Sequence, residues 1–284
     1  MQRTGAQLRV LQRLPQGGTG FATLCREWSA GRQTLVIGAA ALLLFALAWE
    51  AVADLALVDP LFISSPSRIA VVAWQSLGDR DFWRDVKVSS SEFLSGYAAA
   101  ILVGVPLGLA TGWYRRLNYL LGPSIDMLNA VPRVTFLPII VVWFGIGIWS
   151  KFAVVFLGAV IPIIISTQSG VRTNEARFLA VARSFGATPL KLFTSIILPG
   201  TVPFIFTGLK FGAGRALLGV VVGELYASIA GVGHMIAEAG NSFQTDTLFF
   251  GVLLFTGTGL AITIGLDRVE KHFDRWRPEG GGRR

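Results

Sequence analysis

Residues 171–203, VRTNEARFLAVARSFGATPLKLFTSIILPGTVP, decide how the rest of the chain is interpreted. The stretch lies between two long apolar segments, yet it carries four basic residues (Arg172, Arg177, Arg183 and Lys191) against one acid, Glu175. A segment with that many charges does not lie in the hydrocarbon core of a membrane. We therefore expect a cationic element that connects two membrane spans and serves as a docking surface.

The capping residues of this stretch predict two short helices in series. Asn174 is placed to cap the first helix, and Gly186 stands where a glycine with positive φ ends one. Thr188 and Pro189 are a typical N-cap and first position for the second helix, and Pro199 opens the next apolar run. The apolar residues of the first helix follow helical spacing: Phe178, Val181, Ala182 and Phe185.

The composition indicates a polytopic membrane protein. Of the 284 residues, 52% are hydrophobic and 15% are charged, and the mean hydropathy is +0.59. Soluble domains carry about 25% charge. Cys25 is the only cysteine, and the two histidines, His234 and His272, are far apart in the sequence. We therefore expect no disulfide within the chain, no metal site and no catalytic residues.

The apolar runs predict an all-α protein with about six transmembrane helices. The third run has a semipolar helical first part, 119–132, which 134–148 completes, and the fourth run is interrupted by Pro162. An amphipathic surface helix is expected at 66–77. The predicted spans are 34–52, 93–113, 119–148, 152–170, 202–227 and 248–266.

The basic residues predict the orientation of these spans. The tail 1–33 carries five Lys or Arg residues, the tail 267–284 carries six, and 228–247 carries none. Because cytoplasmic loops are enriched in Lys and Arg, both tails and the 171–199 loop are expected in the cytoplasm, with a transmembrane domain at 34–266 between the tails. This distribution also accounts for the net charge of +8, so no nucleic-acid partner is expected.

The 171–203 stretch resembles the "EAA" loop of ABC importer permeases. Ala180, Val181 and Ala182 hold the first three positions of that pattern, Gly186 the glycine, Ile196 the isoleucine, and Leu198-Pro199 the end, with matching spacing throughout. Ala180 stands where the family usually has glutamate, so a role for that carboxylate does not carry over to this chain. The helix–turn–helix shape does carry over.

Four further segments resemble the nitrate/sulfonate/taurine branch of these permeases: 131–147, 161–172, 231–254 and 266–276. The resemblance implies a type I importer permease fold in the bacterial inner membrane. It also implies a second permease copy, two ABC ATPase subunits and an extracytoplasmic solute-binding protein. The sequence has no Walker A glycine–lysine loop. No cofactor is therefore expected on this chain, and ATP–Mg is expected on the partner ATPase.

Under this resemblance, the docking helices seat on the ATPase and transmit its closure to the spans. For the arginines of this loop, the alternative is that they only enforce topology. The residues expected to couple to the ATPase are Arg177, Ala180, Val181, Ala182, Arg183, Phe185, Gly186, Thr188, Leu198 and Pro199.

Arg215 is the main candidate for the solute path, because a charge in the middle of a span costs about 2.5–3.5 kcal/mol on insertion scales and so avoids lipid. Glu224 lies nine residues away in the sequence, on the opposite helical face. Arg215 is expected to contact Asp126, Glu50 or an anion in the pathway. The full candidate set for the path is Asn129, Arg133, Arg215 and Glu224.

The resemblance implies a small, generally anionic solute such as nitrate, a sulfonate, taurine or bicarbonate, and vitamin-like precursors are also carried in this branch. An ion-coupled secondary transporter is the alternative from another class. Pro162 and the pair Pro132 and Pro138 offer the broken helices that such transporters use. The chain has no inverted repeat that we detect and few acids within its spans, which favours the importer.

Overall fold

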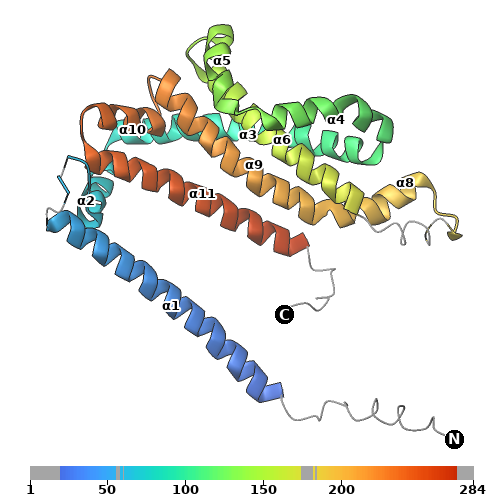
Figure 1. Cartoon of the computed structure of the whole chain (residues 1–284), viewed down its shortest axis with the longest axis horizontal. Helices are drawn as coiled ribbons and strands as arrows, with labels where there is room; N and C mark the ends of the chain where they lie inside the picture. The colour runs from blue at the N-terminus through green and yellow to red at the C-terminus, as the bar shows by residue number, and fades with distance from the viewer. Residues whose placement is uncertain (1–19, 56–57, 60, 174–181, 183, 274–284) are drawn as a thin grey trace, which may run out of the picture. The chain divides into compact units, whose positions relative to one another are not determined.

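The computed structural model describes the backbone of residues 20–55, 58–59, 61–173, 182 and 184–273. The side chains of 20–35 and of Arg133 lie outside the described part. The chain divides into two units, 1–57 and 58–284, and each is described by itself. Every regular element in the described residues is a helix (Figure 1), as the sequence predicted.

Helix α1 (Gly20–Asp54) is the described part of the first unit. Its residues Val36–Asp54 are long and apolar enough to cross a membrane, with a mean hydropathy of 2.2. The first predicted span, 34–52, lies within α1. The helix begins earlier than this span, because the polar residues from Gly20 onward, expected to belong to the tail, continue it.

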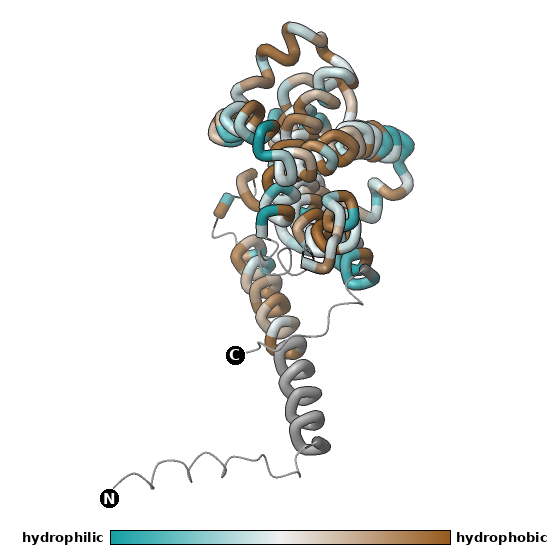
Figure 2. The backbone as a smooth tube through the Cα atoms, turned by 90° about the vertical axis from the view of Figure 1, so that its right-hand side faces the viewer, coloured by the Kyte–Doolittle hydropathy of each residue, from teal (hydrophilic) through white to brown (hydrophobic). Residues whose placement is uncertain are grey.

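Three long helices form the core of the second unit: α3 (Arg80–Trp113), α6 (Ile148–Thr173) and α9 (Leu198–Ala227). Helix α6 packs against both of the others (Figure 1). Apolar side chains such as Val155, Ile163 and Val220 are buried between them. All three helices are long and apolar enough to cross a membrane. Figure 2 shows hydrophobic residues throughout the second unit, as expected for a bundle of membrane spans.

The glycines of α3 allow α6 to approach it closely. A Cβ added at Gly96 would lie 2.7 Å from Val155 Cβ, and one at Gly108 would lie 2.6 Å from Thr167 Cβ. Gly104 faces Ile163 in the same way. The sequence left open whether these glycines face a helix of their own chain or a second protomer, and the structure places α6 of the same chain against them.

The third predicted span is sharply bent. Helix α4 (Arg115–Ala130) is followed by the short 3-10 helix η1 (Arg133–Phe136) and by α5 (Leu137–Phe144). The segments Arg115–Ala130 and Val134–Phe144 are bent by 89° at the break between them. The break coincides with Pro132, whose ring fixes φ and removes a backbone donor.

One expectation about proline is wrong in detail. Helix α6 continues through Pro162 without interruption. The short helix α8 (Pro189–Leu192) is followed without a break by the π-helix η2 (Phe193–Ile197), which joins it to α9, and Pro199 lies in the first turn of α9 as predicted. The π-helix provides a wider turn where a regular helix would break, so 189–227 forms one continuous helical rod.

Three further helices complete the second unit. Helix α2 (Pro66–Ser76), capped by Ser65, is the predicted amphipathic helix, and Ile69 is its buried residue. Helix α10 (Val232–Asn241) lies in the 228–247 segment, where no helix was predicted, and α11 (Thr245–Phe273) contains the last predicted span. The described residues include five helices that are long and apolar enough to cross a membrane, or six if the bent pair counts as one span.

Candidate functional site

Arg215 lines a cavity of about 280 Å³ between the bend of α4 and α5, helix α6 and helix α9. Its side chain is exposed, and no ion pair links it to any residue that the structure describes. Asn129 lines the same cavity from α4. The cavity is otherwise mainly apolar and is lined by Ala130, Val131, Pro132, Val134, Val154, Gly158, Leu218, Gly219 and Val222.

Helices α6 and α9 approach each other closely where they line this cavity. A Cβ added at Gly158 would lie 3.0 Å from the backbone carbonyl oxygen of Arg215. The backbone of Arg215 is therefore held against α6 while its side chain remains accessible. Asn129 and Arg215, both predicted for the solute path, meet in one cavity, whereas the side chain of Arg133 lies outside the described part.

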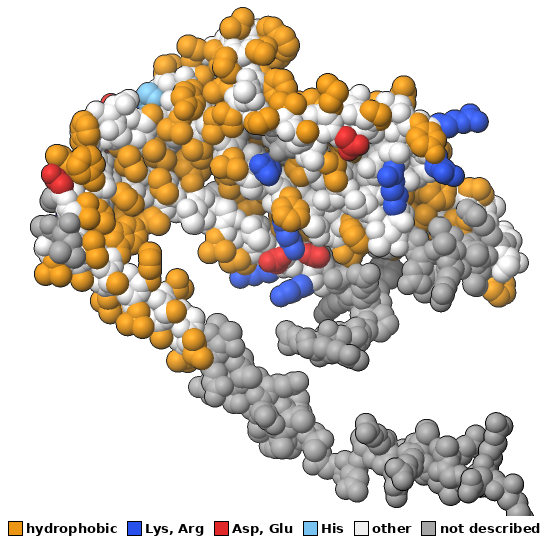
Figure 3. All heavy atoms as spheres, viewed as in Figure 1, with side chains coloured by type: hydrophobic (Ala, Val, Ile, Leu, Met, Phe, Trp, Pro, Cys, Tyr) orange, Lys and Arg blue, Asp and Glu red, His pale blue; other side chains and the backbone are white. Residues whose placement is uncertain are grey.

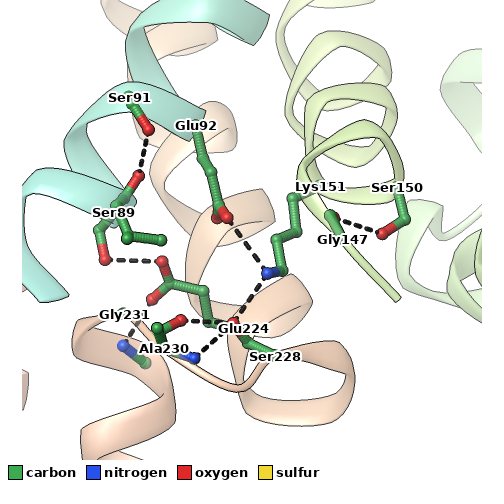
Figure 4. A network of polar contacts seen from close by, with 12 residues as sticks. Ser89, Ser91, Glu92, Gly147, Ser150, Lys151, Glu224, Ser228, Ala230 and Gly231 are labelled. Carbon is green, nitrogen blue, oxygen red and sulfur yellow. Dashed lines mark hydrogen bonds and ion pairs between the residues drawn. The ribbon is translucent and has the colours of Figure 1, made fainter. Parts of the chain in front are cut away.

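Glu224 does not line this cavity, although it was predicted for the same path. Its side chain is fully buried and faces α3 and α10, the face opposite to Arg215. Ser89 Oγ donates a hydrogen bond of 2.6 Å to Glu224 Oε1 (Figure 4). The Gly233 backbone N–H donates one of 2.6 Å to Glu224 Oε2. These contacts join α9 to α3 and to the start of α10.

Lys151 and Glu92 form a buried ion pair beside Glu224 (Figure 4). The distance from Lys151 Nζ to Glu92 Oε1 is 3.1 Å, and Nζ also donates a hydrogen bond of 2.7 Å to Ser228 Oγ. The N-terminal end of α6 is thereby tied to α3 and to the residue that follows α9. Nearby, Asp85 Oδ1 accepts a hydrogen bond of 3.0 Å from the Gly231 backbone N–H.

This network of Ser89, Glu92, Lys151 and Glu224 was not predicted as a site from the sequence. One signal was present, because Glu92 and Lys151 each stand at the edge of a long apolar run, where a polar residue needs a partner. The sequence spacing gave no indication that the two edges meet. The polar atoms of this network bond mainly to one another, so we interpret it as a structural network that holds the helices together.

A second polar cavity, of about 290 Å³, lies between α4 and α6. Asp126 and Arg172 are its charged lining residues. Asp126 was one predicted partner of Arg215, but the two side chains line different cavities and form no ion pair. Within the described part of the chain, no group of three or more His, Cys, Asp or Glu side chains could hold a metal ion.

A turn at Gly186 precedes the rod of α8, η2 and α9. Gly186 has a φ of 77° and the Ala187 backbone N–H donates to the Ala182 carbonyl oxygen at 3.1 Å, which is the predicted glycine-terminated helix end. Thr188 Oγ1 accepts from the Lys191 backbone N–H, which confirms the predicted cap. Phe185 is 86% exposed.

Contacts with α3 hold the start of the rod, a few residues after this turn. The rings of Phe193 and Trp113 meet edge to face, with centroids 5.4 Å apart, and Leu192 and Ile197 are buried. Leu198 and Pro199, predicted for coupling, begin α9. The other predicted coupling residues, Arg177, Ala180, Val181 and Arg183, lie outside the described residues.

Comparison with known proteins places this architecture among transport proteins. Residues 100–277 match the model of the family described as "Binding-protein-dependent transport system inner membrane component". The taurine transport system permease protein TauC of Escherichia coli (strain K12) is 32% identical over 259 residues, covering 89% of this chain and 94% of that protein. A putative aliphatic sulfonates transport permease protein, SsuC of Bacillus subtilis (strain 168), is 29% identical, covering 81% of this chain and 83% of that protein.

A solved structure has the same fold. It is described as inward facing conformations of the MetNI methionine ABC transporter, and it matches with a TM-score of 0.60 and 16% identity. The match covers 67% of this chain and 94% of that chain. At this level of identity the likeness concerns the fold alone.

Proposed function

Because the chain belongs to the family of binding-protein-dependent transport system inner membrane components, we propose that it carries a small anion of the sulfonate class across the membrane. The chain is a multi-pass permease subunit of an ABC importer of the sulfonate and taurine branch. This family membership favours the importer over an ion-coupled secondary transporter. The sulfonate class is supported by the relatives' solutes, taurine and aliphatic sulfonates.

One structural observation supports an anionic solute: the exposed guanidinium of Arg215 in a mainly apolar cavity. A charged group within a span needs a partner or a water-filled path, and no described acid pairs with Arg215. A guanidinium presents a planar set of N–H donors that suits the oxygens of a sulfonate. In this proposal Arg215 and Asn129 contact the solute, and Glu224 has a structural role outside the path.

We further propose that ATP–Mg is bound by two separate ABC ATPase subunits, which dock at the 171–199 loop. Closure of the ATPases displaces α8, and the continuous rod 189–227 moves with it as one body, which changes the Arg215 cavity. The exposed Phe185 is placed to enter a groove of the ATPase. A second copy of this chain completes the path, and an extracytoplasmic binding protein delivers the solute.

The proposed location is the bacterial inner membrane, with the tails 1–33 and 267–284 and the 171–199 loop in the cytoplasm, and 34–266 as the transmembrane domain. The charge distribution supports this orientation. On the face drawn in Figure 3, most Lys and Arg side chains lie at the end of the bundle near α4 and over the C-terminal half of α11, and they lie away from α2 and α10. That is the pattern expected when the α8 end is cytoplasmic.

Reconstitution tests this function. The chain is purified with its ATPase, and the mass of the complex is measured in detergent, where two permease copies and two ATPases are expected. The complex is then placed in vesicles with the binding protein, and uptake of radiolabelled taurine and ethanesulfonate is measured with ATP and with a non-hydrolysable analogue. Uptake of a sulfonate that requires both ATP and the binding protein supports the proposal. Uptake of neither sulfonate, by a complex that hydrolyses ATP, contradicts it.

A further inference from the structure

The polar cavity between α4 and α6 combines opposite charges that do not pair with each other. It is lined by Asn118, Tyr119, Gly122, Pro123, Ile125, Asp126, Gln168 and Arg172. Asp126 and Arg172 are both exposed, and neither forms an ion pair with a residue that the structure describes. Two unlike charges in one cavity of about 290 Å³ would ordinarily neutralise each other. Here they remain separate.

Some neutral polar groups of the cavity are bonded to neighbouring side chains. Gln168 Nε2 donates a hydrogen bond of 2.8 Å to Asn118 Oδ1, which links α6 to α4 across the cavity wall. Arg115 Nη2 donates to the Tyr119 hydroxyl at 3.4 Å. The carboxylate of Asp126 and the guanidinium of Arg172 are the charged groups of the cavity, and they are available to bind a charged ligand.

We propose that this cavity is a second solute site and that it takes a short zwitterion. The acid group of the ligand binds the Arg172 guanidinium, and its ammonium group binds the Asp126 carboxylate. A simple alkylsulfonate would gain the first contact but would meet repulsion from Asp126. The cavity thus selects an amino-sulfonate or amino-carboxylate over an anion of the same length that has no ammonium group.

In this proposal, the cavity lies on the solute path, between the Arg215 cavity and the cytoplasmic end of the path. Gln168 lies ten residues after Gly158 on α6, which is about 15 Å along the helix axis from the Arg215 cavity, toward the 171–199 loop. A solute that has passed Arg215 would meet this cavity before it leaves. The inference rests on the proposed function for the identity of the solute, but the binding that it describes is measured separately from transport.

Equilibrium titration of the purified permease–ATPase complex tests the site without the binding protein. Taurine (2-aminoethanesulfonate) and ethanesulfonate are the two ligands, and an Arg215→Gln background removes binding in the other cavity. We expect taurine to bind at least about tenfold more tightly than ethanesulfonate. Arg172→Gln is expected to weaken both ligands, and the exposed Arg116→Gln, outside the cavity, is the matched control that leaves both unchanged.

Asp126 variants supply the sharper test. Asp126→Asn is expected to bind both ligands equally. Asp126→Lys is expected to bind a third ligand, ethane-1,2-disulfonate, which has an acid group at each end, more tightly than it binds taurine. A wild-type complex with no preference for taurine, or an Asp126→Asn complex that keeps one, would overturn the inference. If this binding pattern holds while the vesicles take up no sulfonate, the proposed function fails and the site stands. If sulfonate uptake is normal and the preference is absent, the site fails and the function stands.

Discussion

Lys151 and Glu92 form an ion pair of 3.1 Å between Nζ and Oε1, and their side chains are only 6% and 2% exposed. The pair joins the first turn of α6 to the N-terminal half of α3. With Lys151 also bonded to Ser228 and Glu224 bonded to Ser89, it holds the N-terminal end of α6 and the C-terminal end of α9 against the N-terminal half of α3. This end of the bundle is therefore expected to behave as one rigid body, while the α8 end receives the motion of the ATPase.

Lys151→Met is expected to destabilise the protein strongly, because it leaves Glu92 buried without its cation. Breaking such a pair costs about 3–5 kcal/mol of unfolding free energy. Chemical unfolding of the purified protein in detergent measures this change. Lys87→Met is the matched control, since Lys87 is exposed and forms no ion pair with a described residue, so its substitution is expected to change the stability by at most about 0.5 kcal/mol. Equal losses in the two variants would show that the buried pair has no special weight.

Gly108→Ala is expected to loosen the packing of α3 against α6. The added methyl carbon would lie 2.6 Å from Thr167 Cβ and 2.8 Å from the Ile164 carbonyl oxygen, so the backbones must separate. Overpacking of this kind costs about 1–3 kcal/mol. Gly257→Ala on α11 meets nothing within 4 Å and serves as the control in the same unfolding experiment. A Gly108→Ala protein as stable as the Gly257→Ala protein would contradict the close contact.

Gly186→Val is expected to weaken capture of the ATPase without affecting membrane insertion. Gly186 has a φ of 77°, a conformation that costs about 1–2 kcal/mol for other residues, so valine would redirect the segment before α8. Pull-down of the ATPase with the solubilised permease measures this effect. Gly265→Val is the control, because it makes the same substitution on α11, where no heavy atom lies within 4 Å of the added Cβ. If Gly186→Val captures the ATPase and takes up solute like the wild type, the turn at Gly186 is not needed for coupling to the ATPase.

The turn at Gly186 and the cap at Thr188 could be predicted because they depend on a few neighbouring residues. The core helices could be predicted because long apolar runs leave few other structures in a membrane. The partners of Glu224 could not, since Ser89 is 135 residues away and their meeting depends on how three helices pack. The same holds for the cavity that brings Asn129 and Arg215 together.

The π-helix at 193–197 was missed for a different reason. Pro199 looks like the start of a helix, because proline is favoured at first positions and removes a backbone hydrogen bond elsewhere. In the structure, the wider turn of the π-helix lies just before that proline, and the helix continues through it. The proline indicated a break between two helices, but the π-helix at 193–197 joins them, and sequence patterns do not predict π-helices.

Trp113→Ala is expected to reduce coupling between ATP hydrolysis and transport. The Trp113 ring packs edge to face on Phe193, which fixes the start of the rod against α3. Without it, displacement of α8 is absorbed locally, so the complex should hydrolyse ATP while it transports less solute per ATP. Trp74→Ala, at a site that is 79% exposed, is the control. An unchanged ratio of solute to ATP in Trp113→Ala would show that this contact does not transmit motion.

Arg215 is proposed to contact an anionic solute, and uptake by the reconstituted complex is the measurement that decides this. Arg215→Gln is compared with wild type and with Arg215→Lys, which keeps the charge but loses the planar donor set. Because the Arg215 side chain is exposed and unpaired among the described residues, all three proteins should assemble and unfold alike. We expect sulfonate uptake to fall at least about tenfold in Arg215→Gln and less in Arg215→Lys. Wild-type sulfonate uptake by a normally folded Arg215→Gln complex would show that Arg215 does not contact the solute.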